Sequence, residues 1–281
     1  MKKIFILCLS IFSQFGFSQD GISHVKDTIS IIPSNDVVEP YYETPLKKTD
    51  AVTNKNLIKV NLFALAVGNF SLQYERLITK KTVVALSAGI TPERGIPFYS
   101  TFEGSIDNQD TKDQLKGVKY SNYAITPEIR FYLGKEGFKG FYIGIFGRYT
   151  SYDVKFPLQY EDVASSIPGL PSGIVPKESI GLDGNIRAFS GGITLGAQWK
   201  LSNRLYLDWL IIGPHFGSSK GDLQGKKKLT LTEQQEIRDA ISDLDIPLVD
   251  YTYEVDDNGA RMRFDGPWAG VRTSLGIGYR F

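Results

Sequence analysis

The sequence contains very few of the side chains that metal centres and nucleophilic catalysis use. Its one cysteine, Cys8, lies close to the N-terminus, and its two histidines are His24 and His215. It contains no HExxH, CxxC, GxSxG or phosphate-binding P-loop motif. A chain whose only cysteine is removed with a leader has no disulfide and no thiolate metal site. The sequence therefore assigns no catalytic residue, no metal ligand and no cofactor.

The chain also lacks an excess of one charge and a long apolar run. It has 32 basic and 31 acidic residues, a formal net charge of +1. A nucleic-acid partner would need a concentrated basic face, so we expect none. No apolar run reaches the ~20 residues that a membrane-spanning helix requires.

The N-terminal residues have the pattern of an export signal. A basic start, an apolar stretch over residues 4–17 and a cleavage zone at Ser18-Gln19-Asp20 predict a secretory signal peptide at residues 1–19. A membrane anchor is the alternative, but the apolar stretch is short for one. Residues 20–55 are polar and contain three prolines, which predicts a flexible periplasmic arm.

The rest of the chain is rich in aromatic residues and glycine and alternates in polarity. Most of its strand-like segments reach the ~9–11 residues of a tilted transmembrane strand. After the first hairpin, short and long connections alternate, which is typical of outer-membrane barrels with both termini in the periplasm. The sequence predicts, for residues 56–281, an all-β, eight-stranded antiparallel up-and-down transmembrane β-barrel with strands at 57–67, 69–78, 82–91, 120–133, 141–156, 185–199, 204–216 and 264–281.

The last strand has two different faces. Leu275, Ile277 and Tyr279 alternate with glycines and with Arg272 and Arg280, and successive strand side chains point to opposite sides. One face therefore suits lipid and the other a polar interior. This ending resembles the C-terminal strand of bacterial outer-membrane barrels, and the resemblance implies the barrel assembly machinery and outer-membrane lipid as partners.

Charged residues of both signs fall on the predicted inner faces. The interior of an eight-stranded barrel is only wide enough for side chains, and buried charges persist when they are paired. We expect a salt-bridge network that fills the lumen and excludes a wide pore; a proton path or a catalytic carboxylate is the alternative. The predicted network is Lys59, Glu75, Glu128, Arg130, Arg148, Asp208, Arg272 and Arg280.

Aromatic side chains cluster where the predicted strands meet the short turns. Aromatic residues favour the membrane–water boundary, and barrels carry a girdle of them at each rim. Tyr149 and Trp268 are expected to contribute to the girdle at the outer rim. The girdle at the short turns is predicted to comprise Phe131, Phe141, Trp199, Tyr279 and Phe281.

The last long loop contains a predicted helix. Thr232 and Gln235 match a capping box, and Ile237, Ile241 and Leu244 recur at helical spacing. We expect this helix to cover the barrel mouth; a partner-binding face is the alternative.

The long loops are also the expected place for recognition. Exposed loops at one end of a rigid scaffold are where binding usually resides, so an unidentified extracellular ligand is expected there. The lysines at 226–228 are either a solvated loop or a contact for anionic headgroups or sugars.

Two other functions compete with a structural or surface-binding barrel. In a lipid- or peptide-modifying barrel enzyme, His215 near Ser218, Ser219 and Asp222 or a lumenal carboxylate would form the site. In a soluble lipocalin-like barrel, an apolar ligand would fill the interior, although the inward charges oppose an apolar cavity.

The first hairpin resembles that of a known family. Residues 56–82 are similar to the opening of a family of small outer-membrane β-barrels of unassigned function in Gram-negative bacteria. The resemblance implies an outer-membrane location and no particular activity. It rests on Lys59, Asn61, Leu62, Leu65, Gly68, Asn69, Ser71, Leu72, Tyr74, Glu75 and Arg76 and on the ending Gly278-Tyr279-Arg280-Phe281.

Overall fold

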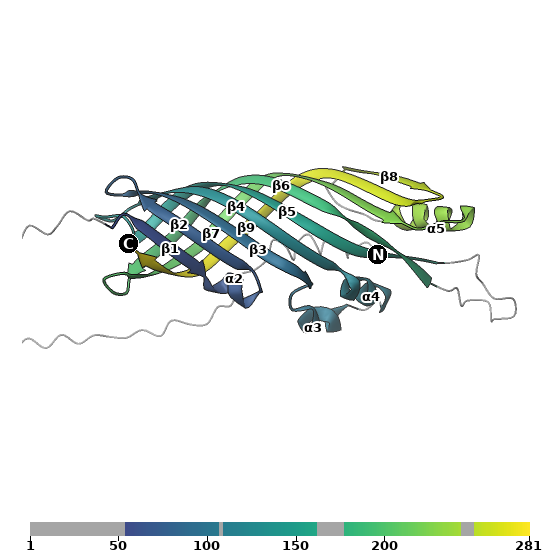
Figure 1. Ribbon diagram of the computed structural model, residues 1–281, viewed down its shortest axis with the longest axis horizontal. Helices are drawn as coiled ribbons and strands as arrows, with labels where there is room; N and C mark the ends of the chain where they lie inside the picture. Colours follow the sequence, from purple (N-terminus) through teal and green to yellow (C-terminus); the bar gives the residue numbers. More distant parts are fainter. Residues whose placement is uncertain (1–53, 107–108, 162–176, 243–249) are drawn as a thin grey trace, which may run out of the picture.

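The computed structural model describes residues 54–106, 109–161, 177–242 and 250–281. The predicted signal peptide and almost all of the predicted arm lie outside these residues. Nine strands form one antiparallel sheet, and eight of them close a ring because β9 pairs with both β7 and β1 (Figure 1). The strands are β1 Asn56–Asn61, β2 Phe70–Leu77, β3 Thr82–Gly95, β4 Lys119–Tyr132, β5 Gly140–Glu161, β6 Lys177–Lys200, β7 Leu205–Lys226, β8 Asp250–Asp256 and β9 Gly259–Arg280.

This arrangement confirms the predicted eight-stranded up-and-down barrel with a helix in the last long loop. The ninth strand, β8, was not predicted; it lies outside the ring and pairs only with β9 in the described part of the chain. Within the described residues, no helix has the length and apolarity to cross a membrane. The helical segments are α2 Leu62–Ala66, α3 Tyr99–Phe102, the 3-10 turn η1 Glu103–Ser105, α4 Gln109–Gly117 and α5 Leu231–Ser242.

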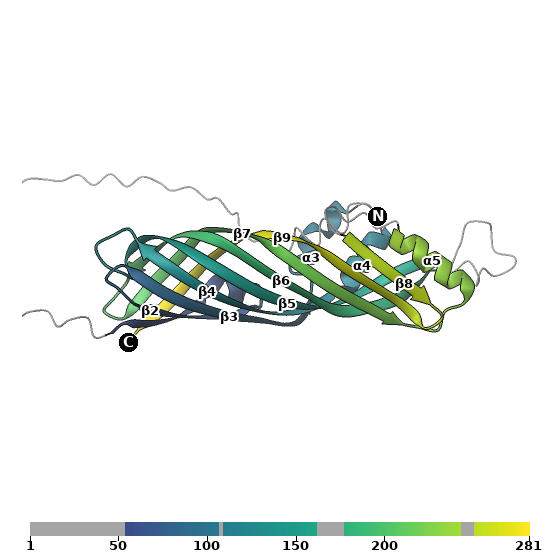
Figure 2. The ribbon, with the colours of Figure 1, turned by 90° about the horizontal axis from the view of Figure 1, so that it is seen from above.

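The two ends of the barrel differ. One end carries the short turns that follow β2, β4 and β6, together with the C-terminus, and we call it the short-turn end. At the other, the long-loop end, α5 and β8 lie at the tip, and α3 and α4 lie between this tip and the middle of the barrel (Figures 1 and 2). The strands also differ in length, from 6 residues in β1 and 8 in β2 to 22–24 in β5, β6, β7 and β9. The long strands therefore extend the sheet beyond the ring.

The first predicted strand, residues 57–67, is wrong in its second half, where the chain forms α2. The segment LFALA has no β-branched residue, and the Asn61 side chain accepts a hydrogen bond from the backbone N–H of Ala64 at 3.2 Å. Such a cap satisfies a donor that the first helical turn leaves free. The helix ends at Ala66, and Gly68 follows it with a φ of 70°, which glycine readily adopts.

The ring portion has an apolar outer surface. On β6, this face runs from Trp199 through Leu195 and Ile193 to Phe189, each more than 40 % exposed. Ten residue steps at ~3.3 Å each, with the strand tilted by ~40°, correspond to a height of about 25 Å. This is the height of the apolar band of outer-membrane barrels, which is ≈ 25 Å.

The polarity of the two faces reverses in the extension of the long strands. Beyond the apolar band, the outer face carries the ion pairs Lys220–Asp265 at 3.2 Å and Arg261–Asp222 at 2.5 Å. The inner face of the same strands becomes apolar and forms a buried cluster with α5 and β8. Its members are Val118, Phe156, Leu158, Tyr160, Ile180, Leu182, Leu223, Leu229, Ile237, Ile241, Val255, Ala260 and Met262.

The predicted helix forms as α5, but its cap and position differ from the expectation. The capping pair is Thr230 and Glu233 rather than Thr232 and Gln235: Glu233 accepts the backbone N–H of Thr230 at 2.8 Å, and the Thr230 hydroxyl accepts the N–H of Glu233 at 3.3 Å. Ile237 and Ile241 pack into this buried apolar cluster, which we call the extension cluster, so α5 covers the inner face of the extended sheet. Leu244 lies outside the described residues.

Candidate functional site

An aromatic cluster closes the short-turn end of the lumen. Phe138, on the turn after β4, is fully buried, and its φ of 63° turns its backbone into the left-handed region. The guanidinium of Arg280 lies 5.1 Å from the Phe138 ring and donates to the Tyr206 hydroxyl at 2.7 Å. Arg280 therefore belongs to this plug and not to a charge network. The plug consists of Leu57, Val83, Tyr132, Phe138, Tyr142 and Tyr206.

Next to this plug, toward the long-loop end (the direction called "above"), five of the predicted inward charges meet. They come from β1, β2, β4 and β7 and form what we call the ion cluster. Arg130 is its centre. The guanidinium reaches Glu75 at 2.7 Å, Asp208 at 2.9 Å and Glu128 at 2.7 Å. Lys59 pairs with Glu75 at 2.5 Å and also with Asp208. Each of the five side chains is at most 3 % exposed.

Neutral neighbours complete the coordination of this ion cluster. The Tyr142 hydroxyl donates to Asp208 at 3.0 Å, and the Thr194 hydroxyl donates to Glu128 at 3.0 Å. The Arg130 guanidinium also stacks over the Tyr142 ring at 4.4 Å. Buried ions are tolerated when pairing and hydrogen bonds replace the lost water. The cluster therefore fills the lower lumen with paired charge.

A cavity of about 1030 Å³ lies above the ion cluster. Its polar lining includes Asn69, Ser71, Gln73, Ser87 and Thr126. The small inward residues of β3, such as Gly89, leave this space open. Lys59, Arg130 and Asp208 of the ion cluster border this space.

Arg148 and Arg272 line this cavity and are paired differently from Arg130. The Arg272 guanidinium lies 3.8 Å from Glu128, and its Nη1 is buried without a hydrogen bond. Arg148 donates to the Thr126 and Thr150 hydroxyls, both at 3.2 Å. No carboxylate of a described residue lies within 4.0 Å of Arg148. The structure thus brings five of the eight predicted charges into one cluster, with Arg272 at its edge and Arg148 and Arg280 apart from it.

The residues predicted for the lower aromatic girdle all lie on the outer surface. Phe131, Phe141, Trp199, Tyr279 and Phe281 are 41–58 % exposed and occur where β4, β5, β6 and β9 meet the short-turn end. The Tyr279 hydroxyl also accepts a hydrogen bond from Arg204 at 2.7 Å.

The expected position of Trp268 in the outer girdle is wrong. It shares the inner face of β9 with Arg272, and its ring packs on Tyr152 with the centroids 5.7 Å apart. Tyr149 does lie on the outer side, beside Tyr123. Three strongly exposed aromatic residues toward the long-loop end were not predicted, although the alternation of their strands places them outward: Phe70, Phe189 and Phe216.

The group around His215 is split between the two faces of β7. His215 points inward, where its ring packs edge-on against Phe146 at 6.1 Å and its Nδ1 is buried without a hydrogen bond. Asp222 and Ser218 lie on the outer face, and Asp222 is engaged by Arg261. Ser219 is inward and donates to the Gly266 carbonyl. These residues do not form a nucleophile–base pair.

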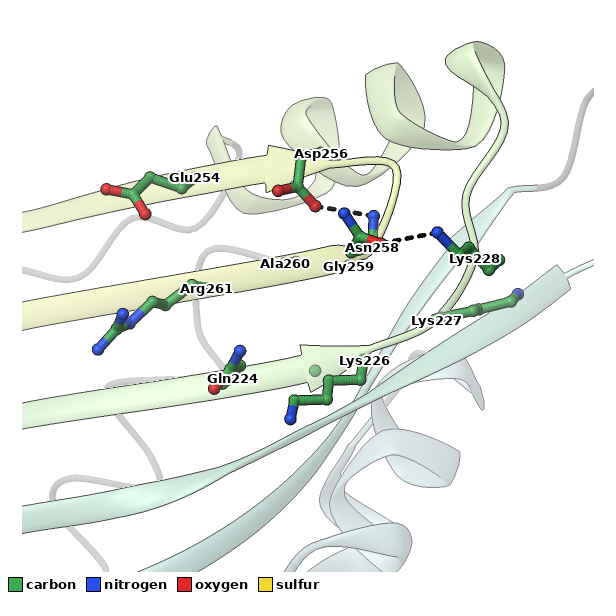
Figure 3. A pocket seen from close by; sticks show the side chains of 11 residues that line it. Gln224, Lys226, Lys227, Lys228, Glu254, Asp256, Asn258, Gly259, Ala260 and Arg261 are labelled. Carbon is green, nitrogen blue, oxygen red and sulfur yellow. Dashed lines mark hydrogen bonds between the residues drawn. The ribbon is translucent and has the colours of Figure 1, made fainter.

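A second, shallower pocket of about 550 Å³ lies at the tip of the long-loop end, where β7 meets the β8–β9 turn (Figure 3). Two of its three consecutive lysines are engaged: Lys227 pairs with Glu178 and Glu233, and Lys228 bonds Asn258 at 2.7 Å. The pairing raises the pKa of Lys227 well above its usual value, mainly through Glu178 and Tyr160 and against the cost of burial.

The described residues contain no group of three or more His, Cys, Asp or Glu side chains that could hold a metal ion. No curated protein matches the chain. Among solved structures, the chain is similar to the N-terminal β-barrel domain of Pseudomonas aeruginosa OprF, with 9 % sequence identity and a TM-score of 0.26; the match covers 81 % of this chain and 98 % of that one. It is also similar to the outer membrane protease OmpT from Escherichia coli, with 10 % identity and a TM-score of 0.27; the match covers 81 % of this chain and 93 % of that one.

The family comparison is more specific. A family model described as "Protein of unknown function" matches residues 44–218, which is more than half of the chain and includes the hairpin on which the resemblance rested. That resemblance, to a small-barrel family without an assigned role, is confirmed. The chain belongs to the family of proteins of unknown function DUF3575.

Proposed function

We propose that the protein spans the outer membrane as a barrel without a wide pore and serves a structural or surface-binding role in the cell envelope. The support for membrane insertion is the outer face, which is apolar over about 25 Å around the ring and charged above it. An inverted arrangement, with an apolar lumen and a polar outside, would be needed for the soluble lipocalin-like alternative.

The proposed orientation follows from the two ends. Short turns face the periplasm in barrels of this class, and longer loops face outward. Both ends of the chain would then be periplasmic, after removal of residues 1–19 as a signal peptide. The C-terminal strand, ending in Tyr279 and Phe281, would be recognised by the barrel assembly machinery, and the long-loop end would meet any extracellular ligand.

The single observation that carries the absence of a pore is the filled lower lumen. The aromatic plug around Phe138 and the ion cluster around Arg130 lie one above the other inside the ring. Bulky buried side chains in both layers support a lumen that is closed to solutes at the short-turn end.

The direct test of this function is reconstitution of the purified chain into lipid vesicles. The folded protein should migrate differently on gels before and after heating, and vesicles that contain it should release no entrapped sugar. Lysis of the vesicles with detergent gives the full-release control, and Phe138→Gly, which removes one ring of the plug and leaves the ion cluster in place, should release no more sugar than the native chain. Steady release by the native chain would contradict a closed barrel, and recovery of the protein in the aqueous fraction after membrane pelleting would contradict membrane insertion.

A further inference from the structure

The wall of the barrel is incomplete on one side. One edge of β9 pairs with β7. The opposite edge pairs with β1 over Gly276–Arg280 and with β8 over Gly259–Asp265. Between them, residues 266–275 have no second strand partner within the described part of the chain. This interruption exists because β1 ends at Asn61 and the chain turns into α2.

The helix α2 stands in place of a strand at this interruption (Figure 1). It packs on β9 and exposes Leu62, Phe63 and Leu65 by 40–48 %. The neighbouring β9 residue Val271 is 50 % exposed on the outer face. The interruption therefore lies at the height of the apolar band, where backbone that is not in a helix or a closed sheet has to line a cavity or be covered by protein.

The lumenal cavity reaches this interruption. Its lining includes inward residues of β9, such as Arg272 and Ser274, and also the outward residues Val271 and Thr273. Residues whose side chains point to opposite faces of one strand border the same space where that space reaches the strand edge. Phe63 and Ala66 of α2 form the other side. The cavity thus opens sideways between α2 and β9.

Charge in the cavity is unbalanced toward the positive. Above the plug, the described lumen holds the cations Lys59, Arg130, Arg148 and Arg272 against the carboxylates Glu75, Glu128 and Asp208. All three carboxylates are engaged by Arg130. Among the residues that the structure describes, Arg148 has hydroxyl partners only, and one nitrogen of Arg272 has no acceptor. A guanidinium is suited to binding an oxyanion through two parallel hydrogen bonds.

We propose that this cavity binds an anionic lipid that enters from the membrane. The phosphate of the head group lies in the lumen against Arg148 and Arg272, and the acyl chains leave between α2 and β9, along Phe63 and Val271. The side opening at membrane height favours a lipid over a soluble phosphate, because the apolar rim contacts the chains. This inference rests on the proposed insertion in the membrane.

The test is lipid binding by the full chain in detergent, measured by native mass spectrometry during titration with phosphatidylglycerol. The double variant Arg148→Gln/Arg272→Gln should bind at least tenfold more weakly. The matched control is Arg187→Gln, which removes an arginine on the outer face of β6 whose guanidinium bonds only Asn185 in the described part of the chain; its affinity should equal that of the native chain. Heat-modifiable gel migration checks independently that each variant is a folded barrel.

Three results would overturn the proposal. The double variant could bind phosphatidylglycerol as tightly as the native chain, phosphatidylcholine could bind equally well, or inorganic phosphate alone could displace the lipid completely and mark a site for a soluble anion. If the double variant does not fold, photo-crosslinking of the native chain decides. Phosphatidylglycerol with a photoreactive acyl chain should label peptides with Phe63 and Val271 more than Ile145 on β5, although Ile145 is the more exposed side chain. Equal labelling would contradict the side opening.

Discussion

At the scale of single residues, the central feature is one arginine that holds three carboxylates. Arg130 contacts Glu75, Glu128 and Asp208 inside a ring whose exterior is apolar. Removing one partner of a buried ion pair leaves the other charge uncompensated, which costs more than the pair contributes. Lys59 can satisfy only Glu75 and Asp208, so Glu128 depends most on Arg130.

Arg130→Met should therefore destabilise the barrel by about 3–5 kcal/mol, the usual cost of breaking a buried ion pair. The measurement is urea unfolding in lipid vesicles, followed by tryptophan fluorescence. The control Arg187→Met, on the outer face, should change the free energy of unfolding by less than about 0.5 kcal/mol, as surface substitutions usually do. A loss no larger than that of the control would show that the ion cluster does not stabilise the barrel.

Alternation along the strands predicted the face of each lumenal charge but not its height. Lys59, Glu75, Glu128, Arg130 and Asp208 meet because the strand register places them at one level. Arg280 has the same inward direction but lies at the base with Tyr206. Register and tilt depend on pairings between distant strands, and a period of two contains no information on them. The prediction for Trp268 failed because it was based on the residue type, whereas alternation along β9 places this side chain on the inner face with Arg272.

At the scale of elements, the extension of the long strands has the polarity of a water-soluble domain: its inner face is apolar and its outer face carries ion pairs. The helix α5 covers its apolar inner face, and the cap residue Glu233 connects this helix to Lys227 and Tyr160. The predicted strands stopped short of this region because the pattern of a membrane strand, apolar outside and polar inside, is reversed there.

The cap of α5 makes the stability of the extension dependent on pH. The backbone N–H of Thr230 is the main reason that the pKa of Glu233 falls from its usual 4.5 to about 2, with Tyr160 and Lys227 contributing. A carboxylate with a lowered pKa in the folded state stabilises at pH above about 4.5, and this contribution is lost as the pH falls toward about 2.

Glu233→Gln should therefore destabilise the extension at pH 7, and the difference from the native chain should shrink between pH 4.5 and pH 2. Hydrogen exchange of α5 amides at several pH values measures it. The half-buried Glu236 of the same helix supplies the control variant Glu236→Gln. A difference between Glu233→Gln and the native chain that stays constant with pH would contradict the cap.

Ile241→Ala tests whether α5 and the extension form one packed unit. Ile241 is fully buried in the extension cluster, and truncation of a buried isoleucine costs about 2–5 kcal/mol. Amide exchange should accelerate in α5 and β8 and stay unchanged in β2 and β3, which lie in the ring. Uniform acceleration in both regions would show that the extension does not open independently.

At the scale of the whole molecule, the same four long strands serve two environments. Below, β6 presents Ile193 outward and Thr194 inward; above, it presents Asp183 outward and Leu182 inward. The sequence predicted the lower part because eight alternating segments and alternating loop lengths point to one topology. It did not predict the upper part, because a reversal of polarity within one strand looks like the end of that strand.

The most direct test of this reversed architecture uses the three tryptophans one at a time. Trp199 and Trp209 are exposed on the apolar band, by 41 % and 43 %, whereas Trp268 faces inward against Tyr152. Variants that keep a single tryptophan, with phenylalanine at the other two positions, are reconstituted in vesicles that contain brominated lipid. The fluorescence of Trp199 and Trp209 should be quenched strongly and that of Trp268 hardly at all. Quenching of Trp199 and Trp209 by aqueous iodide, with no effect of brominated lipid, would contradict a barrel that is apolar outside and ionic within.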